Sequence, residues 1–170
     1  MLEAARSAPD HGAVGTNGKR TRTKRIGSSE PRRDLLARLS VMSRAEPDRS
    51  ADIPPASTAE AAAVARAWLD LIHSGRSASS WAVAAPTLRD TIEPEEWRAA
   101  IRSVRVALGR CHSRRLHSLT TFDAFPGVPP GPYPVTRFES GFEERGGVIE
   151  TVTTRLGEDG HWRVASYFLR

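Results

Sequence analysis

The stretch WRAAIRSVRVALGRCHSRRLHSLTTF, residues 97–122, contains the change of hydrophobic period that determines the fold. In its first half the apolar residues recur at the spacing of one helical face, at Trp97, Ile101, Val104 and Leu108. Gly109 ends this pattern, as glycine often does after the last turn of a helix. Beyond Gly109 the period falls to two, which is typical of a β-strand. The sequence therefore predicts helices up to residue 109 and a sheet after it.

Two further helices are expected before this stretch. Ser57-Thr58-Ala59-Glu60 is a capping box, in which the side chains of the first and last residues accept hydrogen bonds from each other's backbone amides. It predicts a helix from there to Gly75. A shorter helix over residues 78–85 stops at Pro86, because proline disfavours helical geometry in the residue before it. Pro94 suits the first turn of the helix that contains Trp97.

Four strands are expected after Gly109, at about residues 111–122, 133–143, 148–155 and 162–169. Proline and glycine dominate the first connection, and short glycine-containing turns join the later strands as hairpins. Helices followed by an antiparallel meander predict an α+β fold, with three N-terminal helices packed on one face of a curved four-stranded antiparallel sheet.

The charge of the chain is concentrated at its start. The protein has 170 residues and a formal net charge of +5, and residues 1–50 contain 11 Lys or Arg against 6 Asp or Glu. Residues 1–55 also lack any aromatic side chain, so we expect a disordered basic tail there and a single domain over residues 56–170. The folded domain is then neutral overall, which makes nucleic acid an unlikely partner for it. Contact with nucleic acid or an anionic surface through the tail stays open.

Several functional classes are excluded by simple counts. The single cysteine, Cys111, excludes an internal disulfide and every multi-cysteine zinc pattern. No apolar run is long enough to predict a membrane span. Residues 31–36, PRRDLL, are similar to a twin-arginine export motif, but the long apolar region that such a signal needs does not follow. In the absence of a convincing signal segment we expect a cytoplasmic protein.

Short motifs along the chain resemble a known family. In order they are Ser80-Trp81, Trp97 with Arg105 and Leu108-Gly109, Ser113-Arg114, Pro126-Gly127 with Gly131-Pro132-Tyr133, Phe138 with Phe142, Glu150-Thr151-Val152, and residues 159–164 (DGHWRV) with Tyr167. Together they resemble the bacterial domain of unknown function family numbered 4019, over about residues 57–169. The resemblance implies a cystatin-like or nuclear transport factor 2-like architecture and no established activity. Members of that family are commonly exported, which this chain's basic tail does not match.

Glu150 is the main candidate for chemistry, because it shares a strand face with Val148 and Val152. A carboxylate on an apolar face is either a catalytic acid or half of a structural pair. We favour a structural pair with Arg105 or Arg114, which lie on the helix and the strand expected to cover that face. An arginine partner would lower the pKa of the carboxylate, and a general acid needs the opposite shift.

An open cone between helices and sheet would make the same region a ligand pocket. Its polar and aromatic lining would then include the five candidate site residues Arg105, Arg114, Glu150, Tyr133 and Trp162. His112 and His117 are an odd number of positions apart, so they cannot chelate one metal ion on a regular strand. We therefore expect no metal, no cofactor and no catalytic residue.

The function favoured by these patterns is a non-catalytic binding or protein-interaction domain, and an enzyme is the less favoured reading. Self-association through the outer face of the sheet is one possible mode, with a predicted cluster of Ile149, Thr151, Thr153, Ala165 and Tyr167. A small apolar ligand inside the cone is another. The enzymatic alternative places acid–base chemistry in the cone, at Glu150, His117 or Asp123.

Overall fold

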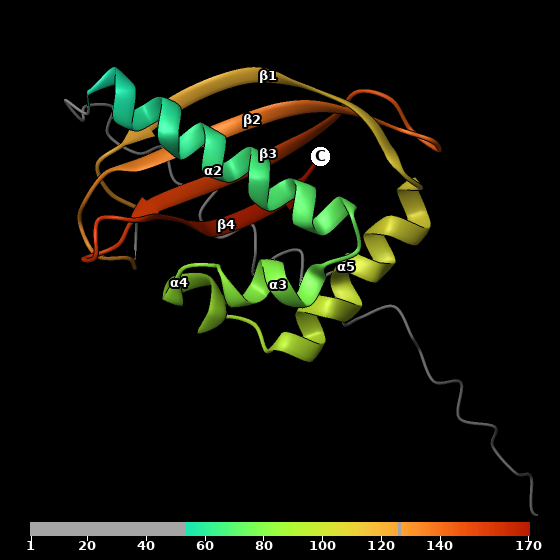
Figure 1. Ribbon diagram of the computed structural model, residues 1–170, viewed down its shortest axis with the longest axis horizontal. Helices are drawn as coiled ribbons and strands as arrows, with labels where there is room; N and C mark the ends of the chain where they lie inside the picture. The colour runs from blue at the N-terminus through green and yellow to red at the C-terminus, as the bar shows by residue number, and fades with distance from the viewer. Residues whose placement is uncertain (1–53, 126) are drawn as a thin grey trace, which may run out of the picture.

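The computed structural model of the protein describes residues 54–125 and 127–170. The basic tail predicted for residues 1–55 lies outside these residues except for Pro54 and Pro55. Within the described part four helices precede a four-stranded sheet, which confirms the α+β class (Figure 1). The helices are α2 (Pro55–His73), α3 (Ser77–Ala82), α4 (Pro86–Arg89) and α5 (Pro94–Leu108), and the strands are β1 (Cys111–Phe122), β2 (Tyr133–Phe142), β3 (Val148–Leu156) and β4 (Trp162–Leu169).

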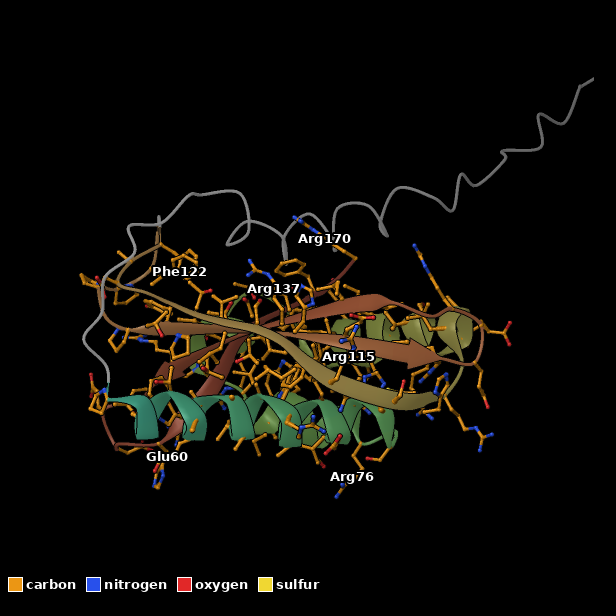
Figure 2. The ribbon with its side chains drawn as sticks, turned by 90° about the horizontal axis from the view of Figure 1, so that it is seen from above. Glu60, Arg76, Arg115, Phe122, Arg137 and Arg170 are labelled. Atoms are coloured by element: carbon orange, nitrogen blue, oxygen red, sulfur yellow. The ribbon has the colours of Figure 1, made fainter. Side chains whose placement is uncertain are left out.

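The sheet is an antiparallel meander with the spatial order β1-β2-β3-β4. Helix α2 lies across one face of the sheet, and the chain then turns back through α3 and α4 to α5, which leads into β1 (Figure 1). Seen from above, Glu60 and Arg76 point away from the sheet on the far side of α2, while Arg137 lies on the opposite face (Figure 2). We call the face covered by α2 the inner face and the opposite one the outer face.

Helix starts differ from the prediction in two places. Helix α2 begins at Pro55, and no side chain caps its first turn, so the capping box expected at Ser57 does not form. Instead the hydroxyl of Thr58 donates a hydrogen bond to the carbonyl of Pro54, 3.1 Å away. The helix expected over residues 78–85 ends earlier, at Ala82 in α3, and Pro86 begins the one-turn helix α4, which was not predicted. Both starts use proline at a first helical position, where its missing N–H costs nothing.

The C-terminal end of α2 places its last residue, His73, beside the sheet. The amide of Arg76 donates to the carbonyl of Leu71, and the amide of Gly75 donates to Ile72. These two bonds form a Schellman motif, which needs a residue with positive φ after the cap, and Gly75 has a φ of 84°. The motif ends the helix sharply, as the sequence predicts for Gly75.

The main core fills the space between α2, α3, α5 and the inner face. It contains two buried tryptophans, Trp68 and Trp97, whose ring centroids lie 5.5 Å apart, and both rings also contact Tyr167. The indole N–H of Trp97 donates to the carbonyl of Ser77 and to the hydroxyl of Ser80, which attaches α5 to α3. Aromatic packing therefore occupies the centre of the predicted cone.

The expected cluster on the outer face is partly wrong. A β-bulge in β4 makes Ala165 the extra residue between the pairs Thr154–Val164 and Thr153–Ser166. The bulge reverses the alternation, so Tyr167 pairs with Val152 and faces inward, and Ser166 and Phe168 face outward. Thr151 and Thr153 are on the outer face as expected, but both side chains are buried.

Candidate functional site

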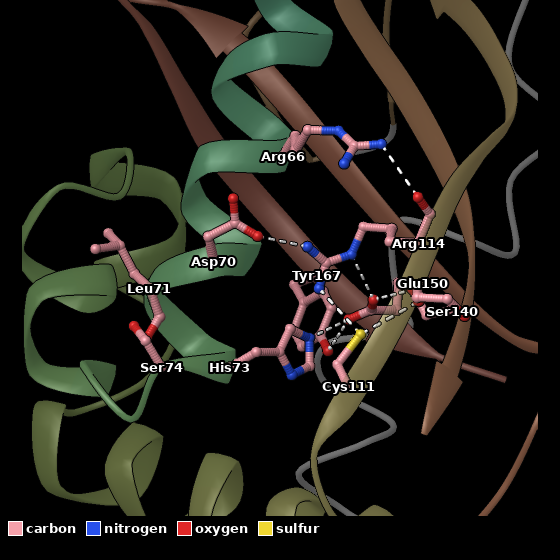
Figure 3. A network of polar contacts seen from close by, with 11 residues as sticks. Arg66, Asp70, Leu71, His73, Ser74, Cys111, Arg114, Ser140, Glu150 and Tyr167 are labelled. Carbon is pink, nitrogen blue, oxygen red and sulfur yellow. Dashed lines mark hydrogen bonds and ion pairs between the residues drawn. The ribbon is translucent and has the colours of Figure 1, made fainter. Parts of the chain in front are cut away.

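Glu150 lies at the centre of a buried polar network, and its carboxylate is completely inaccessible to solvent (Figure 3). Its Oε1 accepts hydrogen bonds from His73 Nε2 at 2.8 Å and from the hydroxyl of Tyr167 at 3.0 Å. Its Oε2 accepts from Arg114 Nε at 3.1 Å and from the hydroxyl of Ser140. Four donors therefore saturate the carboxylate, which has about four favourable acceptor positions.

The guanidinium of Arg114 links this carboxylate to the surface. Besides Glu150, it donates through Nη1 to Asp70 Oδ1 at 2.7 Å and through Nη2 to Cys111 Sγ at 3.7 Å. The side chain of Arg114 is only 6% exposed, whereas that of Asp70 is 61% exposed. Arg66 in turn donates to the backbone carbonyl of Arg114 (Figure 3). The network thus runs from the buried carboxylate on β3 to the exposed side of α2.

Burial and partners act in opposite directions on the pKa values in the network. Burial alone would raise the pKa of Glu150, but the hydrogen bonds from His73 and Ser140 and the charge of Arg114 lower it to about 2. Burial raises the pKa of the Tyr167 hydroxyl, and the neighbouring Glu150 carboxylate raises it further. Burial also raises the pKa of the Cys111 thiol against the lowering effect of Arg114. At neutral pH the carboxylate is ionised, and the phenol and the thiol keep their protons.

A β-bulge in β1 brings Cys111 and Arg114 to the same face. Three positions apart on a regular strand, they would face opposite sides of the sheet. The register shifts by one residue between Cys111 and Ser113, which makes His112 the extra residue. Gly141 stands opposite this bulge, and a Cβ there would come within 2.5 Å of the Ser113 hydroxyl. The bulge and the glycine together direct Arg114 inward.

Three side chains of the network form the set most similar to a metal site in the described residues. His73, Cys111 and Glu150 offer nitrogen, sulfur and oxygen atoms within 4.8 Å of one another, a mixture that suits zinc. However, His73 Nε2 and Glu150 Oε1 are only 2.8 Å apart, whereas two such ligands of one tetrahedral zinc ion lie about 3.3 Å apart. The Arg114 guanidinium also contacts both Glu150 and Cys111. Glu150 and Cys111 therefore already have the Arg114 guanidinium as a cation.

Of the five predicted site residues, the structure brings together only Arg114 and Glu150. Arg105 is exposed on α5, and its guanidinium lies against Gly75 instead of Glu150. Tyr133 faces outward, in a separate cluster with Phe125, and its hydroxyl donates to the carbonyl of Pro129 at 2.5 Å. Trp162 begins β4, whereas Glu150 pairs with Leu169 near the end of that strand, roughly 20 Å further along.

Three residues of the network were not predicted as partners of Glu150: His73, Ser140 and Tyr167. Ser140 lies on β2, two residues from the direct partner of Glu150, Phe138, and it faces the same side of the sheet. Pairing β2 with β3 across their hairpin turn would have indicated that Ser140 is a neighbour of Glu150. Tyr167 was hidden by the bulge in β4, and the position of His73 at the end of a helix gives no signal of a partner on the sheet.

Two hollows in the described part of the chain lie away from Glu150. One of about 420 Å³ is lined by α5 and its neighbours, and one of about 520 Å³ is lined by α4 and the β3–β4 turn. Glu150 lines neither. Among the described helices none combines the length and the apolar character that crossing a membrane requires.

Comparison with known proteins identifies a family without an assigned activity. The model of the family described as "Protein of unknown function (DUF4019)" matches residues 64–167. This match includes α5, all four strands up to Tyr167 and every residue of the Glu150 network. Neither the curated proteins nor the solved structures contain a significant match to the chain. Because the family model covers more than half of the sequence, the chain belongs to this family of proteins of unknown function.

Proposed function

We propose that the protein is a non-catalytic binding domain whose buried polar network is structural and whose ligand contacts lie on its surface. The observation that carries this proposal is the saturation of Glu150 by four donors from four different elements. An ionised carboxylate with a pKa of about 2 has no proton to give near neutral pH and is too weak a base to take one efficiently. The network instead joins α2 to all four strands.

The other reactive groups of the network support the same conclusion. Cys111 is the only thiol, and its raised pKa keeps it in the protonated, weakly nucleophilic form. His73 is held by Glu150 through Nε2, and Cys111 already donates to the carbonyl of Ser113 at 3.4 Å. A nucleophile–base pair needs a direct contact between thiol and imidazole, and no hydrogen bond joins Cys111 to His73.

Two other binding modes have less support. A small apolar ligand inside the cone would have to replace the packed rings of Trp68, Trp97 and Tyr167, since they occupy its centre. Self-association through the outer face would use side chains that are already buried, such as Thr153 and Phe168. Sedimentation of the full-length chain tests self-association directly.

The proposed function is tested by screening the full-length chain with ligand-observed NMR against small carboxylates, phosphates and uncharged compounds. Parent, Glu150→Gln and Tyr167→Phe proteins are compared, with circular dichroism as the check on folding. We expect each compound that binds the parent to bind both variants with a Kd within about twofold, because distant sites act independently. Tyr167→Phe keeps the charge of the network, so this variant carries the comparison with the parent if Glu150→Gln does not fold.

Chemical conversion of a compound by the protein would contradict the proposal of a non-catalytic domain. A compound that the parent converts, and that folded Glu150→Gln or Tyr167→Phe protein leaves intact, would establish catalysis in the network and end the proposal. Loss of binding in both folded variants would place the ligand at Glu150 and contradict the surface location.

A further inference from the structure

The main feature outside the network is the hollow of about 420 Å³ beside α5, called the α5 groove below. Helix α5 forms one side, the turn after α2 forms another, and the residues just before β1 and just after β2 close it. The lining contains four arginines and one acidic residue, namely Arg98, Arg102, Arg105, Arg110 and Glu143. Its volume is within the range of sites for small molecules.

Three of the arginines form a stripe on one face of α5. Arg98, Arg102 and Arg105 are spaced by four and three residues, and this spacing places them next to one another on the helix surface. Like charges at such positions repel each other, so the stripe reduces the stability of the isolated helix. A binding role would account for this arrangement.

The charge in the α5 groove is only partly neutralised. Arg98 pairs with Glu95, and Arg110 pairs with Glu143 at 2.7 Å. Arg102 and Arg105 have no acidic partner among the described residues. Arg115, an exposed arginine outside the groove, pairs with Glu139 at 2.6 Å. The α5 groove therefore carries a local excess of positive charge on a domain that the sequence makes neutral overall.

Gly75 provides the space in which the head group of Arg105 lies. A Cβ at position 75 would come within 2.6 Å of Arg105 Nη1, so any other residue would displace the guanidinium. The helix dipole alone favours a cation at Arg105, which is in the last turn of α5. It gives no such reason for Arg102, in the middle of the helix. The two unpaired guanidiniums thus need a common explanation.

We propose that the α5 groove binds a small soluble molecule bearing carboxylate or phosphate groups, with Arg102 and Arg105 as its main contacts. A guanidinium matches the oxygens of either group through two parallel hydrogen bonds. The groove also contains buried Ile101 and Val106, whose side chain is 80% exposed, and these can contact an apolar part of the ligand. This inference rests on the proposed binding function and assigns it a place and a ligand class.

Calorimetric titration of the full-length chain with pyrophosphate and with citrate tests this proposal at low ionic strength. Arg102→Gln and Arg105→Gln should each weaken binding of at least one probe by about tenfold or more, since a hydrogen bond to a charged group is lost. The matched control is Arg115→Gln, which removes the same charge from an exposed arginine outside the groove. It should change the Kd by less than about twofold.

Three results would overturn the proposal. The first is no measurable binding of either probe by the folded parent. The second is equal weakening by Arg115→Gln, which would indicate general attraction to a positive surface. The third is binding to phosphatidylglycerol vesicles that depends on Arg102 and Arg105 without binding of the soluble probes, which would identify a membrane surface as the partner. The proposed function is judged separately, by Glu150→Gln in the compound screen, so it can survive any of these results.

Discussion

A carboxylate buried completely inside a protein is tolerated only when donors replace the water that it has lost. Glu150 between Val148 and Val152 meets this condition through four donors, of which only Arg114 is permanently charged. The sequence suggested Arg105 or Arg114, and the structure distinguishes them because only Arg114 touches Glu150. This contrast provides a matched pair of variants.

Glu150→Gln and Arg114→Gln should each reduce the free energy of unfolding by a few kcal/mol, up to about 3 to 5, because each removes an oppositely charged partner from a charge that stays buried. The double variant should lose less than the sum of the two. Arg105→Gln is the control and should stay within about 0.5 kcal/mol of the parent. Urea unfolding measures all four variants, and additive losses for Glu150 and Arg114 would contradict a coupled pair.

At the scale of the elements, the four strands and helix α5 follow closely from hydrophobic period and from glycine and proline, whereas α3 ends before its predicted bound and α4 was not predicted. Strand β1 begins at Cys111 and ends at Phe122 as expected. The face of each residue within a strand was less predictable, because the bulges at His112 and Ala165 depend on pairing with a distant strand. The inward positions of Arg114 and Tyr167 follow from those bulges.

The misplacement of Arg105 has a different physical cause. Helix α5 buries Trp97 and Ile101 in its first half, but Val104 and Leu108 are only partly buried. Its apolar stripe therefore leaves the core toward the C-terminal end, and Arg105 turns to the solvent. A single sequence shows the stripe but does not show how far a helix stays on its sheet, which the packing of α2 and α3 decides.

Trp97→Ala tests whether α5 depends on its buried end. We expect a loss of about 3 to 5 kcal/mol in the free energy of unfolding, because the indole is completely buried and its N–H holds α3. Val106→Ala on the same helix removes an exposed apolar side chain and should change stability by less than about 0.5 kcal/mol. Equal effects of the two substitutions would refute the packing of α5 through Trp97.

At the scale of the whole molecule, the domain predicted over residues 56–170 contains the family match at 64–167. Its division from a basic tail stays a prediction, because residues 1–53 lie outside the described part. The cystatin-like or nuclear transport factor 2-like relationship also stays a prediction, since no solved structure matches. The stability of the described domain can be tested through Glu150.

The stability of the protein should depend on pH through Glu150. Its pKa is about 2 in the folded protein against an ordinary value of 4.5, so the ionised form favours folding. The contribution, of about 3 kcal/mol, should be complete above pH 4.5 and should be lost as the pH falls toward 2. Urea unfolding of parent and Glu150→Gln at several pH values isolates it. A difference between the two proteins that stays constant from neutral pH to pH 3 would contradict the ionised carboxylate.

The four donors to Glu150 come from α2, β1, β2 and β4, and this distribution bears on the cooperativity of unfolding. Local opening of any one of these elements would remove a donor from an anion that the other elements still keep from water. Partial opening is thereby disfavoured relative to opening of the whole domain. In native-state hydrogen exchange, the slowest amides of these elements and of β3 should share a single opening free energy, while those of α4 exchange sooner.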